Sequence, residues 1–254
     1  MRDPALTARS ISEFRDTGLL VVAGLAPRAR VGELRELAQA DLAGNPHPAE
    51  FEADLRYPGA PASREAPGGT TTRRLLQAVN RHPAFRDWAS CPEVVTPLRQ
   101  LMAPEVMLSQ THHNCVMTKQ PRFSSVTGWH QDIRYWSFPR PELISVWLAL
   151  GREIPENGCL SFLPGTYAMD VAREQLDDGM FLREDLVENQ RLISNRVTPV
   201  LEPGDVVFFH CRTFHAAGNN RTDKVKLSLV FTYHAADNPP LSGTRSASLP
   251  PVAV

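Results

Sequence analysis

Beyond residue 105 the chain consists of short runs of β-branched and aromatic residues, and Pro, Gly and Asn separate the runs. Short strands with turn residues between them are typical of a β-sandwich or barrel. Strands are predicted at 105–119, 143–150, 159–163, 191–200, 205–210 and 225–234. The pattern favours a mainly β core over residues 105–236, with helices flanking it.

The N-terminus has the signals of a short helix that leads into a strand. Ser10 and Glu13 have the S-x-x-E form of a capping box, which predicts a helix start. Gly18 follows as a C-terminal stop, and the apolar residues 19–22 after it predict a strand.

Further helices are predicted before the β-rich part. Apolar residues recur at helical spacing over 28–43, which indicates an amphipathic helix that lies on the core. Two short helices are expected near 82–89 and 91–102, because each begins with a proline that fits the first helical turn. We therefore expect an N-terminal helical region over 1–104.

Three segments lack a regular pattern. Residues 44–72 contain five prolines and four glycines, which predict a long loop and a candidate lid. Residues 170–190 are highly charged and are expected to form a helical or irregular surface insertion. The proline-rich residues 237–254 are predicted to be an extended or disordered tail. Residues 1–240 are expected to form one domain.

Charge and targeting features narrow the function. The 254 residues contain 27 Lys plus Arg against 28 Asp plus Glu, so no basic excess is present to neutralise nucleic-acid phosphates or an anionic membrane surface. A polar N-terminus and the lack of a run of about 18 apolar residues predict a soluble, cytoplasmic protein. The four cysteines are far apart, which fits reduced thiols. The sequence leaves the oligomeric state open.

A histidine and an aspartate two residues apart form the first part of a candidate metal site. In an extended strand, residues i and i+2 point to the same face, so His130 and Asp132 can present a nitrogen and a carboxylate oxygen to one ion. A His-x-Asp pair alone is weak evidence, because a chain with eight histidines contains such pairs by chance.

A third ligand is predicted at His215, in a polar stretch after the apolar strand that Gly204-Asp205 begins. Two histidines and one carboxylate on one face leave three positions of an octahedron for a bidentate cosubstrate and O2, which favours iron. Zinc remains possible, but a hydrolytic site would need a further general base. His210 is an alternative ligand, although its place in the apolar strand favours a packing role.

A basic residue and a hydroxyl follow eleven residues after His215. Lys226 and Ser228 share one face of a strand, where a cation can pair with the remote carboxylate of a dicarboxylate that chelates iron through its keto acid end. Lys224 has the same parity and is the alternative. A solvated strand edge would explain either lysine equally well.

Several motifs occur together in a fixed order. They are Lys119–Phe123, Trp129–Asp132, Trp147, Glu156–Leu160, Leu163–Gly165, Gly204–Asp205, His215 and Asn220, after a Phe14–Gly18 start. Over residues 11–234 the chain thereby resembles the phytanoyl-CoA dioxygenase family. The resemblance implies a double-stranded β-helix, the cupin-like jelly roll. It also implies Fe(II), with 2-oxoglutarate and O2 as cosubstrates, for hydroxylation or a similar oxidation of a small molecule with release of succinate and CO2.

The resemblance also implies roles for single residues. It places the iron on His130, Asp132 and His215, with no catalytic residue expected beyond these ligands. It places Trp147 beside 2-oxoglutarate, and Arg73 near a basic position of the family. Cys115 is a further candidate contact for the cosubstrate.

The chain departs from the family at two positions of the expected cosubstrate site. The family usually has Arg where this chain has Lys226 or Lys224, and a hydroxyl residue is common where Ala217 stands. Lysine can pair with a carboxylate as a point charge, but it lacks the two-pronged geometry of guanidinium.

Candidate substrate contacts lie around the metal motif. Arg134, Tyr135 and Trp136 follow it directly, where a substrate would meet the iron. Of His112 and His113, one is expected to face inward and the other outward, because side chains alternate along a strand. His112 and Lys119 are therefore also candidates for contact with the substrate.

Two other classes of function compete with the oxygenase. The first is a catalytically silent jelly-roll module that binds a small molecule, which Lys226 and Ala217 favour and the metal triad opposes. The second is a metal-dependent hydrolase or isomerase of the cupin type. Such an enzyme would not need a lysine that binds a carboxylate.

Overall fold

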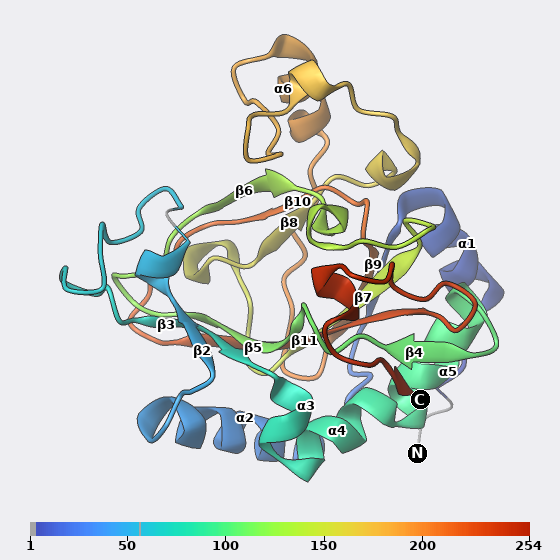
Figure 1. Ribbon diagram of the computed structural model, residues 1–254, viewed down its shortest axis with the longest axis horizontal. Helices are drawn as coiled ribbons and strands as arrows, with labels where there is room; N and C mark the ends of the chain where they lie inside the picture. Colours follow the sequence, from blue (N-terminus) through green and yellow to red (C-terminus); the bar gives the residue numbers. More distant parts are fainter. Residues whose placement is uncertain (1–3, 56) are drawn as a thin grey trace.

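The computed structural model describes residues 4–55 and 57–254 (Figure 1). The first three residues of the predicted N-terminal region, and residue 56 of the predicted loop over 44–72, lie outside the described residues.

Two antiparallel sheets make up the β-rich part. The larger, nine-stranded sheet has the order β1-β9-β7-β11-β5-β3-β2, with β4 beside β11 and β12 beside β4. Its strands are β1 Leu19–Val22, β2 Ala49–Phe51, β3 Thr72–Leu76, β4 Val106–Leu108, β5 Asn114–Lys119, β7 Leu143–Ala149, β9 Val206–His210, β11 Lys226–Ala235 and β12 Val252–Ala253. The three-stranded sheet has the order β6-β10-β8, with β6 Thr127–His130, β8 Leu160–Phe162 and β10 His215–Ala217.

The two sheets pack face to face as a jelly roll. One hydrophobic cluster combines side chains of both, including Trp147, Phe209 and Val230 of the large sheet with Leu160 and Phe162 of the small one. Alternating side chains of each strand therefore enter the space between the sheets, where the candidate metal ligands also lie. This is the expected double-stranded β-helix.

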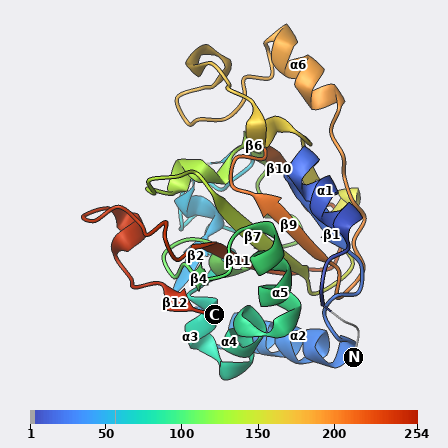
Figure 2. The same cartoon turned by 90° about the vertical axis from the view of Figure 1, so that its right-hand side faces the viewer.

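Helices cover the other face of the large sheet (Figures 1 and 2). They are α1 Ala8–Thr17, α2 Arg28–Ala43, α3 Ala78–Arg81, α4 Pro83–Ser90 and α5 Pro92–Leu101. Leu34, Trp88 and Leu98 on three of these helices pack with Phe208 and Phe231 of the sheet in one core cluster. The predicted helices over 28–43, 82–89 and 91–102 are thereby confirmed. None of the described helices is long and apolar enough to cross a membrane.

The ends of α1 agree only partly with the sequence. Gly18 is the predicted C-terminal stop, and its φ of +69° suits glycine because a Cβ is unfavourable there. The N-cap is Thr7, whose hydroxyl accepts a hydrogen bond from the Ser10 backbone N–H. The capping box predicted at Ser10 was therefore wrong, because the helix begins one turn earlier.

Two strand predictions were also wrong. The run 105–119 is divided into β4 and β5, because residues 109–113 bend and His113 has a φ of +35°. The run 191–200 starts in helix α6, Val187–Ser194, and then makes only an isolated bridge from Val197 to Phe162. Asn189 holds α6 by donating to the carbonyls of Gln175 and Arg183, contacts that no local apolar pattern encodes.

The segment 44–72 is mostly irregular, as predicted, but it includes β2 and a 3-10 turn over Glu52–Asp54. Since β2 is an edge strand, the surrounding prolines do not interrupt a central ladder. The insertion over 170–190 is irregular with one 3-10 turn, as expected, and projects beyond the small sheet (Figure 1).

The tail over 237–254 is not simply extended or disordered as predicted. A 3-10 turn forms at Arg245–Ala247, and β12 pairs with β4. Val254 also accepts a hydrogen bond from Arg99 of α5 through its backbone carbonyl. These contacts are long-range, so the composition of the tail could not reveal them.

Candidate metal and cosubstrate site

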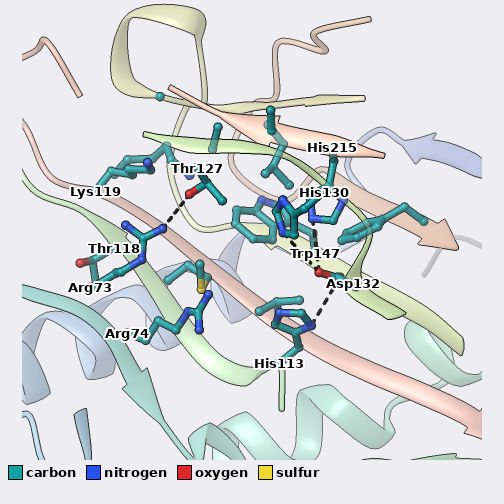
Figure 3. Close-up of a pocket in the computed structure, with 18 residues that line it drawn as sticks. Arg73, Arg74, His113, Thr118, Lys119, Thr127, His130, Asp132, Trp147 and His215 are labelled. Atoms are coloured by element: carbon teal, nitrogen blue, oxygen red, sulfur yellow. Dashed lines mark hydrogen bonds and ion pairs between the residues drawn. The ribbon is translucent and has the colours of Figure 1, made fainter. Parts of the chain in front are cut away.

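Three buried side chains converge between the sheets, and they are the predicted set His130, Asp132 and His215 (Figure 3). One ligand atom from each lies within 4.8 Å of the others. Asp132 Oδ1 is 3.7 Å from His130 Nε2 and 3.4 Å from His215 Nε2.

The sequence brings these side chains together through strand pairing and one extended residue. His130 ends β6 and is the direct partner of His215, which begins β10. Gln131 is extended, with φ −106° and ψ 137°, so Asp132 returns to the face of His130 as expected, although it already begins a 3-10 turn. The Gln131 side chain donates to the carbonyl of Arg212 and so fixes this connection.

Hydrogen bonds orient the two imidazoles. Nδ1 of His130 is 2.9 Å from the Gly128 carbonyl, and Nδ1 of His215 is 3.0 Å from the Thr213 carbonyl. A carbonyl can only accept, so both Nδ1 atoms carry the proton and both Nε2 lone pairs are free for a metal. Burial lowers the pKa of His130 well below its usual value, which keeps this imidazole neutral.

The Asp132 carboxylate has one satisfied and one unsatisfied oxygen. Oδ2 accepts from Ser145 Oγ at 3.3 Å, whereas the buried Oδ1 has no hydrogen-bond donor among the described residues. Burial alone would raise the pKa of Asp132, but the surrounding His113, His215 and His130 hold it well below its usual range. An ionised carboxylate oxygen that faces two imidazole Nε2 atoms in a buried site fits a divalent cation.

His210 lies apart from this cluster. Its ring packs on that of Tyr167, with the two ring centroids 4.9 Å apart, and its Nδ1 accepts a hydrogen bond from the Arg212 backbone N–H. The packing role predicted for His210 agrees with these contacts.

A cavity extends from the metal ligands into the space between the sheets (Figure 3). The space between its walls is about 620 Å³ when the open mouth is included. Besides the three ligands it is lined by Arg73, Arg74, His113, Met117, Thr118, Lys119, Thr127, Trp147, Gly158, Leu160, Phe209, Ala216, Ala217, Lys226 and Val230.

Lys226 is held in a buried network that the sequence did not reveal. Its Nζ is 3.1 Å from Glu153 Oε2 and 3.0 Å from Ser228 Oγ. Glu153 is fully buried, and its Oε1 accepts from Ser228 at 2.6 Å and from the Trp147 indole N–H at 3.0 Å. Three predicted cosubstrate contacts are therefore joined through one carboxylate.

Arg73 is held in a second buried network. Its guanidinium donates to Glu52 at 3.1 Å, to Ser125 Oγ at 2.5 Å and to Thr127 Oγ1 at 2.7 Å. Glu52 also accepts from the Ser125 hydroxyl and backbone N–H. No sequence pattern marks Glu52, because it lies in the proline-rich segment predicted to be a loop.

The two candidate lysines differ in position. Lys226 lines the cavity and is 4% exposed, whereas Lys224 is exposed and is not among the lining residues. The strand β11 begins only at Lys226, so the parity argument for Lys224 does not apply before it. Lys119 is directly opposite Lys226 in the sheet and also lines the cavity.

A second cavity adjoins the first at Arg74 and His113. His112, Cys115 and Tyr135 line it, together with residues of the 44–72 segment and of the tail. The expectation that His112 and His113 face opposite ways was wrong, because both lie in the bend before β5 and both line this cavity.

The two remaining substrate candidates line neither cavity. Trp136 is buried with Leu143 and Cys211 in a hydrophobic cluster. Arg134 stacks on Phe181 of the 170–190 insertion at 4.2 Å. Arg134 thereby connects the metal motif to the insertion, and it is not among the residues that line the two cavities.

A jelly roll that presents two histidines and one aspartate between its sheets defines the class of mononuclear non-haem metal oxygenases. A family model described as phytanoyl-CoA dioxygenase matches residues 14–228. The chain therefore belongs to the phytanoyl-CoA dioxygenase family.

Relatives agree with this family. The human peroxisomal phytanoyl-CoA dioxygenase is 24% identical over 239 residues, which cover 91% of this chain and 69% of that protein. The ectoine dioxygenase of Sphingopyxis alaskensis is 25% identical over 257 residues, which cover 93% of this chain and 78% of that protein.

Solved structures share the fold. The epimerase SnoN in complex with Fe3+, α-ketoglutarate and nogalamycin RO has a TM-score of 0.74 and 24% identity, with 95% of this chain and 89% of that chain covered. EctD from S. alaskensis with 2-oxoglutarate and 5-hydroxyectoine has a TM-score of 0.76 and 22% identity, with 95% and 80% covered.

The chain is thus an enzyme, a dioxygenase that depends on Fe(II), 2-oxoglutarate and O2. This confirms the function expected from the sequence. Neither the silent binding module nor the cupin-type hydrolase is favoured, because the metal triad is assembled and the family is one of dioxygenases.

Proposed function

We propose that this dioxygenase holds its ferrous iron through His130, Asp132 and His215 and oxidises a small molecule that enters by the second cavity. The observation that carries the metal assignment is the buried Asp132 Oδ1, which has no donor and faces two imidazole Nε2 atoms. Bound iron would supply activation of O2, coupled to oxidative decarboxylation of 2-oxoglutarate to succinate and CO2.

The chain's own residues position and shield this chemistry. The carbonyls of Gly128 and Thr213 fix the imidazole tautomers, and Ser145 fixes the carboxylate. Phe162 and Phe209 pack against His215, so one side of the metal is closed to water.

We propose that 2-oxoglutarate occupies the cavity next to the metal. Its keto acid end would face the three ligands, and its remote carboxylate would lie at the inner end, where Lys119 and Lys226 are opposite each other. Trp147 and Arg73 line the same space and would flank the cosubstrate. Ser228 accepts a hydrogen bond from Lys226 and donates one to Glu153, so it would help to hold these two side chains in place beside the cosubstrate.

The substrate would then lie in the second cavity, because this cavity meets the first beside the metal at His113. His112 and Tyr135 line it and offer a ring nitrogen and a hydroxyl. Cys115 lines it as well, so this thiol would contact the substrate rather than the cosubstrate. These polar groups favour a small polar molecule as the substrate.

We also propose that residues 1–240 form one domain, since helices and strands contribute to one hydrophobic core. A cytosolic location is supported by four free cysteines. A near-neutral charge of −1 supports a protein that binds no nucleic acid.

The test is an anaerobic titration of the Fe(II)-loaded protein with 2-oxoglutarate, followed by the visible charge-transfer band of keto acid chelation. The band should appear in the wild type and in His210→Ala, and it should be lost in Asp132→Ala. Iron-loaded wild type that gives no band would refute the proposed site.

A further inference from the structure

The inner end of the cosubstrate cavity contains a basic side chain without a carboxylate partner among the described residues. Four basic side chains line this cavity, and three of them have a carboxylate partner: Arg73 with Glu52, Arg74 with Glu50 and Lys226 with Glu153. Among the described residues no acidic side chain pairs with the fourth, Lys119, which is only 6% exposed.

Lys226 is already engaged with protein groups. Its Nζ donates to Glu153 Oε2 at 3.1 Å and to Ser228 Oγ at 3.0 Å, and it lies 4.9 Å from the centroid of the Trp147 ring. A second carboxylate next to Lys226 would also lie next to the fully buried Glu153. Two anions so close in a dry site repel each other strongly.

Lys119 has the opposite properties. Its Nζ donates to the Ser125 carbonyl at 2.6 Å, which leaves two ammonium hydrogens free. Burial, followed by Arg73 and Lys226, lowers the pKa of Lys119 well below its usual value. A buried amine that loses its charge for want of an anion is a site where an anion is missing.

Strand pairing supports the same conclusion. Lys119 on β5 is the direct cross-strand partner of Lys226 on β11, and like charges in that position are destabilising. Glu153 neutralises one of the two lysines and leaves a single positive charge. The inner end of the cavity therefore fits one further carboxylate.

We propose that Lys119, and not Lys226, binds the remote carboxylate of the cosubstrate, while Glu153 holds Lys226 and the Trp147 indole as a fixed wall. The inference rests on the proposed cosubstrate cavity. It assigns the choice of a dicarboxylic over a monocarboxylic 2-oxo acid to Lys119.

The experiment compares Lys119→Met with the charge-balanced variant Lys226→Met/Glu153→Gln. Each Fe(II)-loaded, oxygen-free protein is titrated with 2-oxoglutarate and with 2-oxobutanoate, which lacks the remote carboxylate, and the Kd is taken from the charge-transfer band and from calorimetry. Iron content and thermal unfolding establish that each variant is folded. Lys119→Gln replaces Lys119→Met if the latter does not fold.

Lys119→Met should weaken 2-oxoglutarate binding by about 10- to 100-fold, because a charged hydrogen bond to the carboxylate is lost. Binding of 2-oxobutanoate should not change, which a merely structural defect would not produce. The double variant should weaken 2-oxoglutarate binding less than Lys119→Met does, since it removes a neutral pair.

The inference is overturned if the double variant loses as much affinity for 2-oxoglutarate as Lys119→Met, or more. It is also overturned if Lys119→Met weakens both acids equally. Failure of the underlying function looks different, because the iron-loaded wild type would then give no band with either acid.

Discussion

Removing the charge of Glu52 should destabilise the protein severely, although this residue lies in a proline-rich segment. Its side chain is 0% exposed and accepts from Arg73 Nη1 and from the hydroxyl and backbone N–H of Ser125. In Glu52→Gln the neighbouring guanidinium, also buried, would keep its charge without a counter-ion.

The magnitude follows from burial. Breaking a buried ion pair by removing one partner costs about 3–5 kcal/mol, because the remaining charge stays in a medium of low dielectric constant. For a chain of this size that corresponds to a fall in Tm of about 6–20 °C. The exposed pair Arg140–Glu142 supplies a matched control, and Glu142→Gln should cost less than about 1 kcal/mol.

Urea unfolding followed by circular dichroism measures both free energies of unfolding. The double variant Glu52→Gln/Arg73→Met separates charge from hydrogen bonding, since it should recover most of the loss if the uncompensated charge is the cause. A loss below about 1 kcal/mol in Glu52→Gln, or a double variant no more stable than the single one, would refute the reasoning.

Three further predictions concern the metal, pH and a turn. Fe(II) at a hundredfold excess over its Kd should stabilise the wild type by about 2.7 kcal/mol in anaerobic thermal unfolding. His215→Ala should lose this stabilisation, and His210→Ala should keep it. The reverse result would mean that His210, and not His215, is the metal ligand. Burial lowers the pKa of His210 to about 4, so its neutral form is favoured by folding. The stability that the neutral imidazole contributes is present above pH 6.5 and lost as pH falls toward 4. The free energy of urea unfolding of the wild type should therefore fall by up to about 3 kcal/mol relative to that of His210→Gln. A difference between the two proteins that does not change with pH would contradict this prediction. Gly158→Ala should lower the free energy of unfolding by about 1–3 kcal/mol in the same assay, because φ is +74° and a Cβ would lie 2.5 Å from the Gly218 carbonyl oxygen. Gly151→Ala should be near neutral, because nothing lies within 4 Å of a Cβ there. Equal losses in the two variants would argue against backbone strain at Gly158.

Part of the fold could be read from contiguous residues. The amphipathic helix over 28–43 and the stop at Gly18 depend on spacing and backbone preference within a few residues, and both were predicted. The run 191–200 shows the limit, because short apolar runs fit a strand or a helix equally well. Contacts of Asn189 with distant carbonyls select the helix.

The metal ligands were predictable because their chemistry is carried by residue type. His130 and Asp132 share a face through local backbone geometry, and the carboxylate and imidazole groups themselves indicate a metal. The choice between Lys226 and Lys224 was not local, since it depends on where β11 begins its pairing with β5 and β7.

The sequence by itself identified the candidate metal-binding triad, the β-rich core and most of the flanking helices, because these depend on residue chemistry and short-range periodicity. Only the tertiary structure decided which cations are already paired. Glu52 and Glu153 are 21 and 73 residues from the Arg73 and Lys226 they neutralise, and no local pattern encodes contacts at that separation. That Lys119, on which the proposed cosubstrate site depends, has no carboxylate partner among the described residues is visible only after those pairs have formed between distant parts of the chain.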